Sequence, residues 1–148
     1  MSKYFEDFNI GDVFESPGVT LTESSIIEFA LKYDPQRFHT HVEAAKQSPY
    51  GGLIASGFHT LCVGFRMFAQ LGVIAESSLG SPGIEDLRWL KPVRPGDTLH
   101  TRVTIQDARE SKSRPDRGIL TEFYEVFNQN GEAVMTYRSP ILVAKAGR

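Results

Sequence analysis

The sequence predicts an α+β fold in which one antiparallel sheet curls around a single apolar helix. Residues 57–74 leave almost no polar side, and a helix that is apolar nearly all round is a buried one. The residues after it alternate between apolar and polar types and are separated by turn signals, which is typical of strands. A chain of 148 residues suits one domain with its own core, and we expect residues 1–148 to form it.

Composition and charge indicate an ordinary globular protein. The hydrophobic share is 41% and the charged share 23%, and the 16 basic and 18 acidic residues leave a net charge of −2. Without a basic field, neither nucleic acid nor an anionic membrane is expected as a partner. The single cysteine, Cys62, excludes an internal disulfide, and no apolar run approaches the roughly 20 residues of a membrane helix. We therefore expect a soluble cytoplasmic protein.

A first helix is expected to reach about Lys32. Thr20 and Glu23 have the spacing of a capping box, and Thr22 begins a weaker one. Pro35 ends the helix, because the residue before a proline is pushed out of the helical region.

The segment after this helix predicts a loop over 34–41 and a short helix over 42–46. Thr40 and Glu43 have capping-box spacing at the start of that helix. A second loop follows at 48–52, where serine, proline and two glycines gather.

The long apolar helix is interrupted strongly at only three positions, His59, Arg66 and Gln70. At 3.6 residues per turn these three fall on one narrow stripe. The rest of the chain is therefore expected to wrap the helix.

Five strands are expected around it. Asn130-Gly131 is a strong hairpin signal, and Pro140 indicates a sheet edge or a bulge in the last strand. The expected strands are 13 to about 17, 84–90, 99–105, 119–127 and 132–144.

Candidate functional residues gather between Tyr33 and Thr60. Asp34 and His39 lie five residues apart across a proline, and a carboxylate and an imidazole on one loop can share a water and move its proton. Ser56-Gly57 opens the apolar helix, where free backbone N–H groups can stabilise developing negative charge. The stretch therefore predicts an acid–base site, with Ser56 as the helix N-cap.

The same residues carry a resemblance to a known family. The chain resembles the MaoC-like acyl dehydratases of the hotdog superfamily, which include (R)-specific enoyl-CoA hydratases. Asp34 and His39 match the family's acid and imidazole in type and spacing. The pair Ala44-Ala45, the run 51–57 and the run 90–97 also match, so that the resemblance covers nearly the whole chain.

The resemblance implies a hotdog fold and the hydration of trans-2-enoyl-CoA to (R)-3-hydroxyacyl-CoA, or the reverse dehydration. It assigns catalysis to Asp34 and His39 and the binding of the thioester oxygen to the N–H of Gly57, beside Ser56. Which of the pair takes the proton and which gives it stays open. A thioester of CoA or of acyl carrier protein is the expected partner, no cofactor is expected, and a homodimer or higher homo-oligomer is implied.

The sequence departs from the family pattern at three positions. Pro35 directly follows the acid, Gln36 stands where an asparagine is usual, and Cys62 replaces a serine. Cys62 is expected to pack in the core, and His59 to be a core or interface histidine. The four histidines lack paired ligand spacing, so no metal site is expected.

Two other functions remain open. A hotdog thioesterase usually relies on an acidic residue of the central helix, and no Asp or Glu lies between Gly57 and Ile74. A protein that binds acyl thioesters without catalysis is the third possibility.

Overall fold

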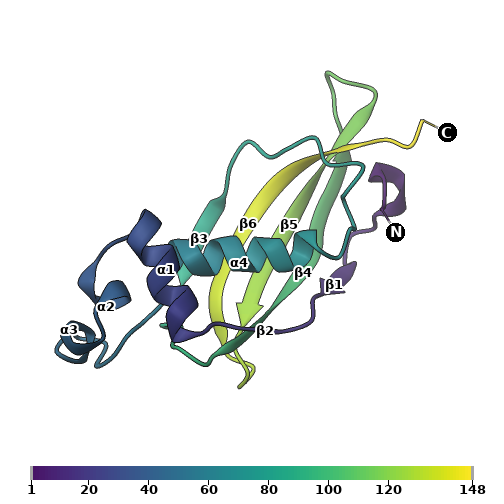
Figure 1. Cartoon of the computed structure of the whole chain (residues 1–148). Helices are drawn as coiled ribbons and strands as arrows, with labels where there is room; N and C mark the ends of the chain where they lie inside the picture. Colours follow the sequence, from purple (N-terminus) through teal and green to yellow (C-terminus); the bar gives the residue numbers. More distant parts are fainter. Residues whose placement is uncertain (1, 148) are drawn as a thin grey trace.

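An antiparallel sheet with one long helix across it forms the centre of the protein (Figure 1). The computed structural model describes residues 2–147. All strand pairs are antiparallel, so the predicted architecture of an antiparallel sheet with a central helix is confirmed. The order across the sheet is β1 (Val13–Glu15), β4 (Thr98–Glu110), β5 (Arg117–Phe127), β6 (Ala133–Ala144) and β3 (Glu85–Trp89), and β2 (Val19–Thr20) also pairs with β4.

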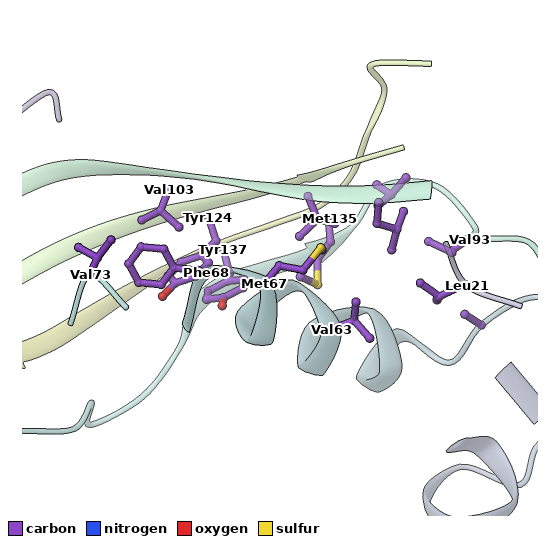
Figure 2. Packing of buried hydrophobic residues seen from close by; sticks show 14 of the residues in the cluster. Leu21, Val63, Met67, Phe68, Val73, Val93, Val103, Tyr124, Met135 and Tyr137 are labelled. Carbon is purple, nitrogen blue, oxygen red and sulfur yellow. The ribbon is translucent and has the colours of Figure 1, made fainter. Parts of the chain in front are cut away.

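The helix α4 (Gly57–Ala69) packs its inner side on this sheet. Gly64 allows the close approach, because a Cβ there would lie 2.7 Å from Cγ2 of Val126. The Thr101 hydroxyl donates to the Gly64 carbonyl at 2.8 Å and fixes the helix to β4. Figure 2 shows the core between the two layers, with Val63, Met67 and Phe68 of α4 opposite Val103, Tyr124 and Met135 of the strands.

The prediction that α4 is buried all round is wrong. Phe58 and Phe65 are 56% and 45% exposed, on the flank of the helix that the sheet covers only in part. The physical reason is that one sheet covers one side of a helix only. The helix also ends at Ala69 rather than near residue 74, since the chain turns through Gly72 at a φ of +75°, a left-handed value that glycine tolerates.

Three short helices gather where α4 begins (Figure 1). The first helix, α1, ends just before Pro35, as predicted. Its N-cap is Thr22, because Thr20 belongs to β2, where it pairs with Thr98 of β4. The hydroxyl of Thr22 accepts from the N–H of Ser25 at 3.0 Å. These helices are α1 (Glu23–Tyr33), α2 (Arg37–Thr40) and α3 (Val42–Lys46), and a 3-10 turn η1 (Phe5–Asp7) precedes them.

Two local predictions in this region are wrong. Residues 34–41 are not all loop, because α2 occupies 37–40. Thr40 therefore ends α2 and cannot cap the next helix. The cap of α3 is His41, whose ring Nδ1 accepts from the N–H of Ala44 at 3.0 Å.

The strand predictions hold. Every second residue of β4 from Leu99 to Ile105 is buried, as the alternation predicts. The β5–β6 hairpin turns through Gly131 at a φ of +73°. Pro140 lies in β6, which has a neighbour on each side, but β3 pairs with β6 only as far as Arg138. The proline therefore has no β3 partner, but residues 77–80 pair with 142–144 just beyond it, so β6 is an internal strand. The predicted sheet edge or bulge is not found at Pro140, because no register shift occurs there.

Candidate active site

Asp34 and His39 meet where α1 ends and α2 begins. Asp34 is the C-cap residue of α1, and the turn through Gln36 brings α2 back towards it. Oδ2 of Asp34 lies 3.3 Å from Nε2 of His39, and the side chains are 12% and 5% exposed. The structure thus brings the two predicted residues together at the edge of a cavity.

Two further side chains hold the carboxylate of Asp34. The Ser56 hydroxyl donates to Oδ2 at 2.6 Å, and Nε2 of Gln36 donates to Oδ1 at 2.8 Å. Burial by itself raises the pKa of Asp34, but the bonds from Ser56 and Gln36 and the interactions with His39 outweigh it and lower that pKa below its ordinary value. Asp34 is therefore a carboxylate at neutral pH.

The imidazole of His39 is fixed through its other nitrogen. Nδ1 lies 2.7 Å from the carbonyl oxygen of Ile54, so Nδ1 carries a hydrogen and donates it. When His39 is protonated, its Nε2–H can donate to Asp34. When it is neutral, Nε2 and the carboxylate are two acceptors that one water can bridge with its two O–H groups. The arrangement can bind a water and exchange protons with it.

A cavity of about 410 Å³ opens in front of this pair. Gly57, the first residue of α4, lines it, and its N–H has no hydrogen-bond partner among residues 2–147. Ser56 caps the helix, as predicted, by accepting from the N–H of Phe58 at 3.2 Å. A free N–H at the start of a 13-residue helix is a suitable donor for an oxygen that gains negative charge.

Trp89 was not singled out from the sequence, yet it forms one wall of this cavity. Its Nε1–H donates to the Gly57 carbonyl at 2.9 Å. A Cβ at Gly57 would lie 2.4 Å from Cε2 of Trp89, so the glycine also has a packing role. Trp89 lies in an edge strand 32 residues away, and no local pattern links the two positions.

Two other contacts of Asp34 were not predicted, and only one of them is local in the sequence. Gln36 lies two residues after Asp34, so its bond to the carboxylate is a local contact that the sequence could have suggested. The bond from Ser56 to Asp34 crosses 22 residues and needed the fold.

The remaining candidates lie outside the pair. His59 is buried and stacks on Phe29 with ring centroids 4.6 Å apart, but its Nδ1 has no hydrogen-bond partner in the described chain. Cys62 is exposed, so the expectation that it packs in the core is wrong; it lies on the side of α4 that the sheet leaves open.

Residues 2–147 contain neither a cluster of metal-ligating side chains nor a membrane-spanning helix. No three His, Cys, Asp or Glu side chains there come close enough together to hold a metal ion. No helix in that range has the length and hydropathy of a membrane span.

The comparisons with known proteins decide the family. The model of the MaoC-like domain matches residues 7–122, which is most of the chain. The chain belongs to the MaoC-like domain family. This family comprises hydratases and dehydratases of acyl thioesters, and the predicted membership of the MaoC-like family is confirmed.

Individual MaoC-like proteins are similar over nearly the whole chain. The structure of a MaoC-like dehydratase from Rhodospirillum rubrum is 37% identical, covers 99% of both chains and superposes with a TM-score of 0.91. Mesaconyl-CoA hydratase of Cereibacter sphaeroides is 36% identical over 97% of this chain but only 41% of its own length. A Mycobacterium tuberculosis protein described as a double hotdog fold has a TM-score of 0.79 at 19% identity, covering 99% of this chain and 45% of its own. The fold is a hotdog fold, as expected.

Proposed function

We propose that this MaoC-like protein hydrates trans-2-enoyl thioesters to (R)-3-hydroxyacyl thioesters, and catalyses the reverse dehydration. The observation that carries the proposal is the contact between Asp34 and His39, whose partners Ser56 and Gln36 fix the carboxylate beside the free N–H of Gly57. Substrates with CoA or acyl carrier protein as the thiol fit the family, and no cofactor takes part.

The chemistry needs two proton movements and one new C–O bond. A water bound between the carboxylate and the imidazole loses a proton to one of them, and its oxygen bonds to C3 of the enoyl group. The electron pair of the double bond moves towards the thioester carbonyl, whose oxygen gains negative charge. A proton then passes from the pair to C2, which gives the 3-hydroxyacyl product and restores the protonation of the site.

The geometry favours addition of both parts of water to one face. Asp34 and His39 lie on the same side of the cavity, so the hydroxyl and the proton arrive from that side. The N–H of Gly57 lies at the positive end of α4 and stabilises the enolate oxygen. Each group is held by a neighbour, so little reorganisation accompanies the reaction.

We further propose that the protein is at least a homodimer. The open side of α4 exposes Phe58 and Phe65, and the adjoining residues Ile84, Trp89 and Leu90 are also exposed. Beside them, β3 is an edge strand with unpaired backbone groups. A second copy that covers this surface would bury it, and a monomer mass in light scattering at micromolar concentration would contradict the dimer.

One assay tests the proposed reaction against its alternatives. The protein is incubated with crotonyl-CoA while the loss of enoyl absorbance and the release of free thiol are followed together. The expected result is loss of enoyl absorbance without thiol. Thiol release would indicate a thioesterase, and binding without either change would indicate a protein that holds thioesters without catalysis.

A further inference from the structure

A second cavity, of about 380 Å³, lies along α4 and holds none of the groups used in the proposed reaction. It is enclosed by the helix, the segment 78–84 and the strands β5 and β6. The first cavity is lined by Phe58, and the second begins at Leu61, on the next turn of the same helix. Most of its wall is apolar, through Leu61, Phe65, Ile84 and Ile141.

Glu122 is the one acidic residue among those that line this cavity, which also include serine and tyrosine hydroxyls. The residue is 1% exposed, and its Oε1 accepts a hydrogen bond from the Tyr124 hydroxyl at 3.0 Å. Its Oε2 is buried and has no hydrogen-bond partner in the described chain. A buried polar atom without a partner is costly, and natural proteins rarely keep one without a use.

The neighbouring hydroxyls do not supply the missing partner. Ser139 lies opposite Glu122 in the β5–β6 register, but its Oγ lies 3.0 Å from that of Ser81 and 3.2 Å from the Gly83 carbonyl. The Tyr124 hydroxyl already donates its one hydrogen to Oε1. The Tyr137 hydroxyl is engaged with that of Tyr124, so the partner of Oε2 is a water, a bound molecule or a group of the second copy.

The chemistry of Oε2 selects the kind of partner. Burial raises the pKa of Glu122 to about 7, so both protonation states are present near neutral pH. An alcohol hydroxyl can donate to Oε2 when the group is ionised and accept from it when it is protonated. An ammonium would have to give up its hydration to enter an apolar cavity, and an alkyl group would leave Oε2 unpaired.

We propose that the second cavity is a binding site for a short aliphatic group that carries a hydroxyl, with Glu122 as the residue that recognises the hydroxyl. The apolar wall takes the aliphatic part. The group is either the far end of a thioester substrate or a free short-chain alcohol. The first source rests on the proposed function, and the second does not.

The distances along α4 allow the first source. Gly57 and Phe65 are eight residues apart, which is about 12 Å at 1.5 Å per residue. An extended acyl chain of about eight to ten carbons, with its carbonyl at Gly57, is of comparable length.

Saturated thioesters test the first source without turnover. Calorimetry compares ω-hydroxyacyl-CoA esters of six to ten carbons with acyl-CoA esters in which a methyl group replaces the hydroxyl. At the best length, wild type should prefer the hydroxyl about tenfold, which corresponds to 1.4 kcal/mol. Glu122→Gln keeps an acceptor and should keep most of the preference, whereas Glu122→Met should lose it.

Free alcohols test the second source. Ligand-detected NMR compares 1-pentanol with 1-methoxybutane, which has the same heavy atoms but no donor, in wild type and in Glu122→Met. A preference for the alcohol that depends on Glu122 would place a free molecule in the cavity. Circular dichroism checks that each variant is folded.

The combined results leave the proposal supported or overturned. A hydroxyl preference that depends on Glu122 in either experiment supports the site and identifies the source. If the alcohol binds in this way while no thioester binds, the site stands and the proposed function fails. If neither experiment shows a preference that depends on Glu122 in folded protein, the proposal is wrong.

Discussion

Asp34 and Glu122 are two carboxyl groups beside two neighbouring cavities of α4, and their surroundings shift their pKa values in opposite directions. Asp34 receives hydrogen bonds from Ser56 and Gln36 and faces His39, which lowers its pKa despite the cost of burial. Burial dominates at Glu122, where Tyr124 is the one donor, and raises the pKa to about 7. Asp34 is the ready base because its donors outweigh a smaller cost of burial, whereas Glu122 combines deeper burial with fewer donors.

The largest loss of activity is expected when the ionised carboxyl group of Asp34 or its partner His39 is removed. Asp34→Asn keeps the shape but removes the charge, and His39→Ala removes its partner. Each should lower kcat/KM on crotonyl-CoA by about a hundredfold or more, the usual scale for acid–base groups. Asp116→Asn, at an exposed carboxylate paired with Arg117, is the matched control and should keep full activity. Full activity in Asp34→Asn would reject the assignment.

Obstructing the N–H donor should have the next largest effect. Gly57→Val places a branched side chain where the thioester approaches, and it also collides with Trp89. The substitution is therefore compared with Trp89→Ala alone and with Gly57→Val in the Trp89→Ala background, where the collision is removed.

We expect the folded double variant to lose at least tenfold in kcat/KM relative to Trp89→Ala, since the approach to the N–H stays blocked. Equal activity of these two variants in steady-state assays would leave Gly57 with its packing role only.

A smaller loss of activity is expected when one hydrogen bond to the carboxylate of Asp34 is removed. Ser56→Ala removes a donor to the carboxylate, so the pKa of Asp34 should rise, and the acid limb of the pH profile of kcat/KM should move to higher pH. We expect a loss of about tenfold at the wild-type optimum, as for other positioning hydrogen bonds. Thr22→Ala removes the cap of α1 without touching Asp34, and should lower stability by about 1 kcal/mol without moving the profile.

The smallest effect on catalysis is expected from substituting Glu122. The substitution should instead change how the free energy of unfolding depends on pH. The pKa of Glu122 is raised from 4.5 to about 7, so the native state binds the proton more tightly than the unfolded state. Native wild type should therefore lose stability as pH rises from about 4.5 to 7 and change no further above that range.

Glu122→Gln lacks this dependence. Its stability relative to wild type should rise by up to roughly 3 kcal/mol between pH 4.5 and 8, because each pH unit in the window contributes at most about 1.36 kcal/mol. Urea unfolding at fixed protein concentration measures it, and parallel pH curves for the two proteins would contradict the raised pKa.

The sequence predicted the parts of this fold that depend on local pattern. Alternation identified the strands, and the spacing of Asp34 and His39 identified the pair. The same alternation offers a signal for Glu122, which follows Leu120 and precedes Tyr124 on the buried side of β5. A carboxyl group at such a position indicates a buried ionisable residue.

Tertiary contacts decided what the pattern did not predict. Thr20 has good capping spacing, but its pairing with Thr98 takes it into β2 and leaves the cap to Thr22. The bond from Ser56 to Asp34 and the approach of Trp89 to Gly57 join distant segments. The open side of α4 depends on how much of a helix one sheet can cover.

A double-mutant cycle at Asp34 and His39 tests most directly the claim that the two residues act on one water. Steady-state kinetics on crotonyl-CoA are measured for wild type, Asp34→Asn, His39→Ala and the double variant. Because either loss already disables the shared proton transfer, kcat of the double variant should be within a fewfold of the slower single variant. If the two losses multiply instead, each residue acts independently of the other, and the shared acid–base site is contradicted.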